Sequence, residues 1–179
     1  MESNFNITKG MTSRYEKTLS FIKKNIPDKK RVLDLGVPNP FSDLMKEKGY
    51  EVFNTHGEDL DYHPEVVKQY DGIECVTALE ICEHLINPMG VLSQLPSDKL
   101  IASIPLSLWF SKAYRSKTDP WDRHFHEFED WQFDWLLEKA GWKVMASEKW
   151  TAPISQIGIK PLLRKFTPRY YIVYAERAK

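Results

Sequence analysis

A short apolar run that ends at a glycine constrains the fold of this chain more than any other feature. The run from Arg31 to Gly36 has the composition of a short β-strand, and it stops where a glycine permits a sharp turn. Asn39 can then cap a helix whose first turn accepts Pro40. A strand, a tight loop and a helix in this order predict one unit of an α/β protein.

The same alternation continues along the chain. Further apolar runs predict strands over 50–54, 72–77, 99–104, 142–146 and 170–175. Apolar residues at helical spacing predict helices from Thr12 or Ser13 to Ile26, from Pro40 to Gly49, through Leu92 and Leu95, and from Glu129 or Asp130 to Gly141. We therefore expect one α/β domain, with an N-terminal helix over about 11–26 and a core over about 30–179. The core should be a doubly wound, mostly parallel sheet of about six strands with helices on both faces.

The connection from His56 to Asp71 is short for such a fold. A helix, a strand and their loops normally take roughly 10, 5 and 8 residues, which is more than this segment offers. We expect no full helix-plus-strand unit there.

Charge and composition exclude several classes of protein. Lys plus Arg number 25 and Asp plus Glu number 25, so no general basic character favours a nucleic-acid partner. No apolar run reaches the roughly 20 residues that cross a bilayer, and the first residues lack the pattern of a secretory signal. Cys75 and Cys82, both in apolar surroundings, suit reduced thiols. We expect a cytoplasmic protein that binds neither nucleic acid nor membranes.

The second half of the chain is rich in aromatic residues. All six tryptophans lie there, and they indicate either a large core or a pocket for a flat or sugar-like ligand; we favour the core. The segment from Leu106 to Phe128 has no clean period. It predicts a long loop with short helical pieces that covers a site.

Four motifs in this order resemble those of a known family. They are the strand 32–36, Tyr70-Asp71, the segment 77–85 followed by Asn87-Pro88, and 126–128 with Lys139-Ala-Gly-Trp142. Together they resemble the class I S-adenosylmethionine-dependent methyltransferases, in particular the type 11 group related to ubiquinone-biosynthesis enzymes, from Lys30 to Val144. The resemblance implies a Rossmann-like fold with a shortened cofactor half, S-adenosyl-L-methionine as cofactor and a small-molecule or sugar acceptor.

The resemblance also implies a set of cofactor-binding residues. Asp34 and the loop after it would hold the methionine part, the acidic turn after the second strand would meet the adenine, and residues after the third strand would line the cleft. The ribose-binding position is open between Asn54, His56 and Glu58. The implied cofactor residues are Asp34, Gly36, Val37, Pro38, Asn54, Asp59, Leu60, Asp61, Leu79 and Glu80.

The cofactor loop departs from the family pattern. Its second and third glycines are absent, and Pro38 and Pro40 stand in the region. This disfavours a dinucleotide site, which needs three glycines around a pyrophosphate. It also leaves two functions open: an active methyltransferase, which we favour, and a degenerate fold that serves as a binding or regulatory partner.

The cluster from Asp119 to Glu127 is the best candidate for substrate chemistry. Its His124 and His126 suit the removal of an acceptor proton near neutral pH, so we expect them to be catalytic. With a carboxylate they could also hold a divalent ion, or they could simply hydrogen-bond the loop to the next helix. We expect no metal. Glu83 and His84 border the methyl-transfer site in the resembled family, and a capping or packing role is equally open for them.

Overall fold

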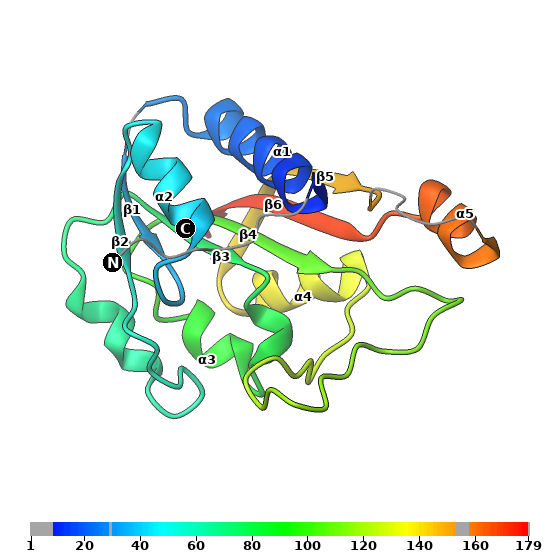
Figure 1. The fold of residues 1–179 in the computed structure, drawn as a ribbon. Coiled ribbons are helices and arrows are strands. Elements are labelled where there is room, and N and C mark those ends of the chain that lie inside the picture. Colours follow the sequence, from blue (N-terminus) through cyan, green and yellow to red (C-terminus); the bar gives the residue numbers. More distant parts are fainter. Residues whose placement is uncertain (1–8, 29, 153–157, 179) are drawn as a thin grey trace.

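Six strands form one sheet in the order β2-β1-β3-β4-β6-β5 (Figure 1). The computed structural model describes residues 9–28, 30–152 and 158–178. The strands are β1 (Arg31–Asp34), β2 (Glu51–Asn54), β3 (Cys75–Leu79), β4 (Lys99–Pro105), β5 (Trp142–Trp150) and β6 (Tyr170–Arg177). Strands β1 to β4 run parallel, whereas β6 is antiparallel to both of its neighbours. The predicted mostly parallel, six-stranded sheet is confirmed, and its last strand along the chain, β6, lies between β4 and β5.

Helices cover both faces of this sheet, as predicted. They are α1 (Lys9–Asn25), α2 (Pro40–Glu47), α3 (Pro88–Leu92), α4 (Asp130–Lys139) and α5 (Ile159–Phe166). Helices α1 and α2 lie on one face and α3 and α4 on the other (Figure 1). A hydrophobic core lies on each face of the sheet, and successive strand residues point into opposite cores. Val32 packs with Ile22 and Met45 on one face, and Leu33 belongs to the cluster that contains Phe133 on the other. No helix in the described part of the chain is long and apolar enough to span a membrane.

The predicted short connection after β2 is also confirmed. It contains a 3₁₀ helix, η1 (Pro64–Gln69), and no strand between Asn54 and Cys75. Val67 of η1 is fully buried, and the Tyr70 hydroxyl donates a hydrogen bond of 2.9 Å to the Asn54 carbonyl. The short helix η1 therefore covers this part of the sheet, where a longer helix-plus-strand unit would normally lie.

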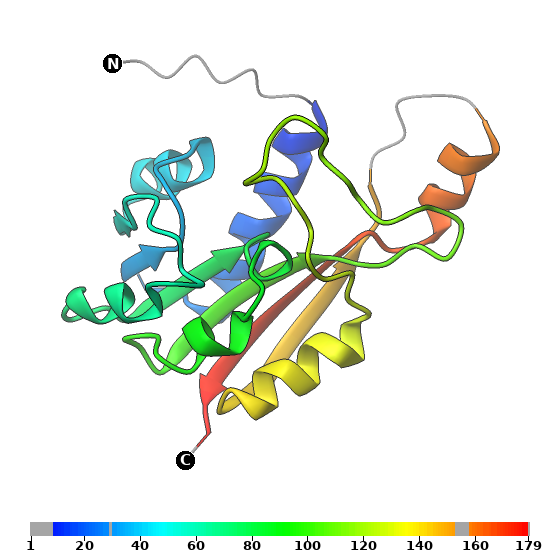
Figure 2. The ribbon, with the colours of Figure 1, turned by 90° about the horizontal axis from the view of Figure 1, so that it is seen from below.

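Several element boundaries differ from the prediction. Strand β3 spans Cys75–Leu79 instead of 72–77, because Gly72 has φ 65° and turns the chain before the strand begins. Strand β5 continues to Trp150, beyond the predicted end at Ala146, since it pairs with β6 over its whole length. Helix α5 was not predicted, and the segment 106–128 contains turns and bends but none of the expected helical pieces. In Figure 2 this segment extends past the end of β4 as a long loop.

The tryptophans mostly do not fill the core, so that prediction was wrong. Trp142 is buried, but Trp109, Trp121, Trp131 and Trp135 are between 44% and 80% exposed. Helix α4 buries Phe133 and Leu137 against the sheet. Trp131 and Trp135, one turn apart, therefore pack on each other beside that face with their ring centroids 4.8 Å apart.

The exposed position of Trp135 gives a stability prediction. Replacing Trp135 by serine removes a side chain that is 65% exposed and contacts Trp131, so the free energy of unfolding should fall by no more than about 1.5 kcal/mol. Urea denaturation followed by circular dichroism measures this. The same substitution at the buried Phe133 should be much more destabilising; equal losses at the two positions would contradict the orientation of α4.

Candidate active site

Two adjoining cavities open at the carboxyl ends of the parallel strands. The first, about 320 Å³, lies between α1, the end of β1 and the end of β3. The second, about 440 Å³, lies between the turn after β2 and the segment that follows β3. Gly36 and Ile81 line both cavities. Ligands bind beyond the carboxyl ends of strands in open α/β sheets, so the two cavities form a candidate cleft.

Asp34 is the centre of a polar network beneath the first cavity. Its carboxylate accepts hydrogen bonds from the Thr77 hydroxyl at 2.6 Å, the Asn39 amide at 3.1 Å and the Asn54 amide at 3.2 Å. Asp34 is nearly fully buried. Burial raises its pKa to about 6, while the three hydrogen bonds oppose the rise. The acid predicted to face the cofactor is thus held rigidly at the end of β1.

The loop after β1 turns at a single glycine. Gly36 has φ 104°, and its N–H donates to the Thr55 hydroxyl at 2.8 Å. Asn39 then caps α2 by accepting hydrogen bonds from the N–H groups of Phe41 and Ser42. The predicted cap is confirmed, and it uses two amides at the start of α2. The surface that this loop offers to a ligand is therefore made of side chains and the backbone around Gly36.

The first cavity combines an acid and a guanidinium. Glu80 follows β3 and is the one non-glycine residue with positive φ, 55°, in the described part of the chain. Its carboxylate accepts a hydrogen bond from the Ser103 hydroxyl at 2.9 Å and pairs with Arg14 of α1 at 3.3 Å. Burial raises the pKa of Glu80, and the Arg14 charge lowers it. The cleft thus offers both charges that a zwitterionic amino acid needs.

The second cavity has an acidic floor and an apolar, aromatic rim. The carboxylate of Asp61 accepts hydrogen bonds from the N–H groups of Ile86 and Asn87 at 2.8 and 2.7 Å, so it holds the turn after β3. Asp59 accepts the Asp61 N–H at 3.1 Å, and Leu60 is buried below them. Exposed rim side chains include Tyr62, Ile86, Trp121 and Phe125. This shape and chemistry suit a flat heterocycle.

Eight of the ten predicted cofactor residues line the two cavities. Asp34, Gly36, Val37, Leu79 and Glu80 line the first, and Gly36, Asp59, Leu60 and Asp61 line the second. Pro38 lines neither, and Asn54 supports Asp34 and the Gly36 carbonyl from below. Arg14 also lines the first cavity. It was not predicted as a site residue, because the sequence pattern of its helix indicates only an amphipathic surface.

The two predicted catalytic histidines lie in different surroundings. The Nε2 atom of His126 is 3.2 Å from the Ile86 carbonyl, and its ring stacks on Phe128. His124 instead lies beside His84, with the ring centroids 4.8 Å apart and the rings perpendicular. His124 also lines a third, basic cavity of about 600 Å³ in the loop after β4. His124 and His84 are therefore a pair, while His126 contacts the backbone.

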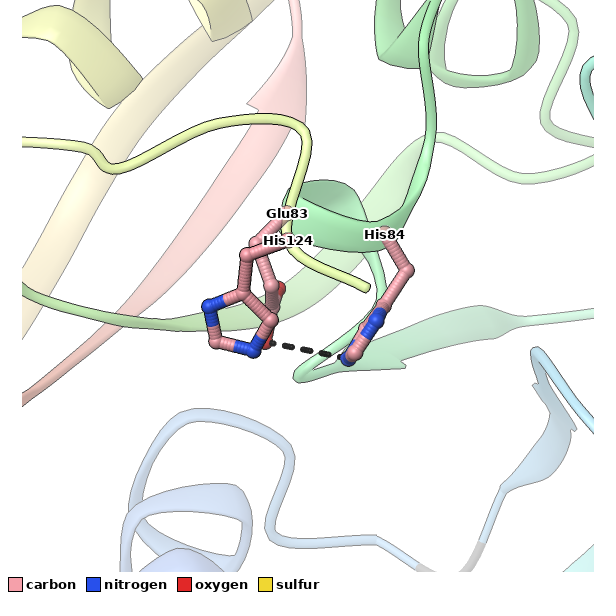
Figure 3. Close-up of side chains that lie close together, drawn as sticks. All are labelled: Glu83, His84 and His124. Carbon is pink, nitrogen blue, oxygen red and sulfur yellow. Dashed lines mark ion pairs between the residues drawn. The ribbon is translucent and has the colours of Figure 1, made fainter. Parts of the chain in front are cut away.

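Glu83 lies close to this pair of histidines and forms a cluster of three side chains with them (Figure 3). It lies in the 3₁₀ turn η2 (Cys82–His84), and its carbonyl accepts hydrogen bonds from the N–H groups of Phe125 and His126 at 2.8 and 3.3 Å. These bonds hold the loop onto η2. Burial raises the pKa of Glu83 well above its usual value, and the charge of Glu80 adds to this; burial lowers the pKa of His124.

Comparisons with known proteins identify structural neighbours only. No protein-family model matches the sequence, and no curated protein matches it significantly. Many solved structures match the fold. A SAM-dependent methyltransferase from Archaeoglobus fulgidus aligns with TM-score 0.58 and 17% identity, over 91% of this chain and 94% of that one. A second, from Mesorhizobium loti, aligns with TM-score 0.63 and 12% identity over 92% and 98%. The N-terminal domain of EvdMO1, solved with SAH bound, aligns with TM-score 0.53 and 15% identity over 92% and 81%.

Proposed function

We propose that this chain, which has the fold of the class I S-adenosylmethionine-dependent methyltransferases, binds S-adenosyl-L-methionine in the two adjoining cavities and methylates a small-molecule acceptor. The observation that carries the proposal is the charge pattern of the first cavity. Asp34, Glu80 and Arg14 meet there beside the Gly36 turn. One structural neighbour is described as a SAM-dependent methyltransferase and another was solved with SAH bound, which supports this cofactor.

The residues of the cleft fit this cofactor. The Arg14 guanidinium matches the carboxylate of its amino-acid end, and the carboxylates of Asp34 and Glu80 match the ammonium group. Asp59 and the aromatic rim of the second cavity suit the adenine. When bound, the cofactor supplies an electrophilic methyl group on a sulfonium. The chain's own task is then to orient the acceptor and exclude water.

The basic cavity beside His124 supports an anionic acceptor. It is lined by Arg115, Lys117 and Arg123 in addition to His124 and Tyr114. The net charge of the chain is zero, so this positive charge is local. We place the acceptor there, with His124 rather than His126 facing it, because His126 contacts the Ile86 carbonyl. The buried thiols of Cys75 and Cys82, both free, support a cytoplasmic location.

Calorimetric titration with S-adenosylmethionine and S-adenosylhomocysteine tests the proposed function. We expect both to bind with micromolar affinity, because the charged groups of the cleft are already in place. The rival function is a degenerate, non-catalytic binding protein, and the glycine-poor loop with its self-capped α2 favours it. A well-folded sample that binds neither compound would decide for the rival.

A further inference from the structure

Three metal-binding side chains converge at the wall between the cleft and the basic cavity. One ligand atom each from Glu83, His84 and His124 lies within 4.8 Å of the others. His84 lines the second cavity, and His124 lines the basic cavity. Figure 3 shows the three side chains grouped beneath η2 and the loop that carries His124.

The orientation of His84 leaves one ring nitrogen free. Its Nδ1 atom lies 3.1 Å from the Arg123 carbonyl, which can only accept a hydrogen bond, so Nδ1 carries the proton. In the neutral ring Nε2 then has a lone pair, and this atom lies 3.7 Å from a carboxylate oxygen of Glu83. Histidines that bind metals commonly donate their second N–H to a backbone carbonyl in this way.

The carboxylate of Glu83 is buried without sufficient partners. The residue is 1% exposed, and its Oε2 atom has no hydrogen-bond partner. The Nδ1 atom of His124 is also buried and has no hydrogen bond, and a carboxylate oxygen of Glu127 lies 3.5 Å from it. The 3.7 Å gap between His84 and Glu83 is too long for a hydrogen bond. No hydrogen bond therefore joins the side chains of Glu83, His84 and His124, although one ligand atom of each lies within 4.8 Å of the others.

We propose that Glu83, His84 and His124 bind a divalent first-row transition-metal ion. Two imidazoles and one carboxylate are a common ligand set for Zn²⁺, Mn²⁺ and Fe²⁺, and three ligands leave coordination positions open. On the premise of the proposed function, an open position would hold an acceptor oxygen between the two cavities and lower the pKa of an acceptor hydroxyl. His124 then acts as a ligand, and the expectation of no metal is revised.

The ion would also join the loop after β4 to η2. Glu83 and His84 belong to η2, whereas His124 is carried by the loop. Metal binding should therefore raise the melting temperature, because the ion binds the folded arrangement of the three ligands and not the separated segments.

Titration of the chelator-treated full chain with ZnCl₂, MnCl₂ or CoCl₂ tests the proposal. We expect one ion per chain with micromolar affinity for at least one metal, and visible absorption bands for bound Co²⁺. Glu83→Gln and His84→Gln should each weaken binding by about 100-fold or more, which exceeds the loss seen when outer partners are removed. If Glu83→Gln does not fold, His124→Gln provides a loop variant with the same expected loss.

A matched control comes from His63. This histidine also lies near a glutamate, with its Nδ1 atom 3.5 Å from Glu65, but both side chains are exposed. His63→Gln should keep the wild-type metal affinity. Failure of all three ions to bind at micromolar concentration, or unchanged affinity in the Glu83 and His84 variants, would overturn the proposal.

S-adenosylmethionine titrations on the same metal-free sample separate the two proposals. Metal binding without cofactor binding would retain the ion site and reject the proposed function. Cofactor binding without metal binding would reject the ion site and retain cofactor binding as part of the proposed function.

Discussion

Replacing Gly36 by valine is expected to weaken S-adenosylmethionine binding by about 100-fold or more while the chain remains folded. Gly36 lines both cavities, so a branched side chain there intrudes where the two parts of the cofactor would join. Its φ of 104° also resists any β-branched residue, and a Cβ would lie 3.7 Å from the Ile81 Cδ1 atom. Calorimetry measures the affinity, and circular dichroism checks the fold.

Gly141 provides the matched control for this substitution. It has φ 86° in the turn between α4 and β5, where a Cβ would find only the end of Arg177 about 4.0 Å away. Gly141→Val should therefore carry a similar backbone strain and lower the melting temperature without changing cofactor affinity. Undiminished affinity in Gly36→Val would place the cofactor elsewhere, and equal losses in both variants would make the effect one of stability.

The sequence predicted those parts of the fold that are encoded locally. Asn39 caps α2 and Pro40 begins it because both signals act within one turn of chain. The shortened connection after β2 followed from its length alone. The exposure of Trp135 and the length of β5 could not be predicted in the same way, since each depends on which partner lies opposite: the sheet beneath α4, and β6 beside β5.

The site residues likewise fall into those that a local sequence motif indicates and those that only the tertiary structure brings together. Asp34 and Gly36 were predicted because they belong to one strand-turn motif. The pairing of Arg14 with Glu80 joins residues 66 positions apart, and no local pattern in α1 indicates it. His124 and His126 are two positions apart in the sequence, which suggested one shared role, but side chains this close along a loop can point in different directions. The tertiary structure instead joins His124 to Glu83 and His84.

The affinity for S-adenosylmethionine is expected to fall below about pH 6. Burial raises the pKa of Asp34 in the free chain to about 6, from the usual 3.8 of an aspartate side chain. The ammonium and sulfonium charges of the cofactor favour the ionised carboxylate, so binding at low pH must first release a proton. One titrating group of this kind should reduce the affinity about tenfold between pH 7 and pH 5. Calorimetric titrations across this range measure the slope.

The raised pKa of Asp34 also determines whether the free energy of unfolding of the cofactor-free chain rises or falls with pH. Because the folded-state pKa of Asp34 is raised, the folded state binds more protons than the unfolded state between the two pKa values. The free energy of unfolding should therefore fall as the pH rises from about 4 to above 6, by about 3 kcal/mol from this group. Cofactor binding should offset part of this loss, so the melting temperature should rise more on adding cofactor at pH 7.5 than at pH 5.

Asp34→Asn isolates the contribution of this carboxylate. The variant keeps the size of the side chain but cannot ionise, so it should bind the cofactor more weakly at pH 7.5 and show a flatter dependence on pH. Glu80 and Arg14 line the same cavity, and the raised pKa of Glu80 leaves a residual slope in the variant. The difference between the slopes of the two proteins therefore belongs to Asp34. Parallel pH profiles would show that ionisation of Asp34 does not affect cofactor binding. The amino-acid end of the cofactor would then have to bind away from the end of β1.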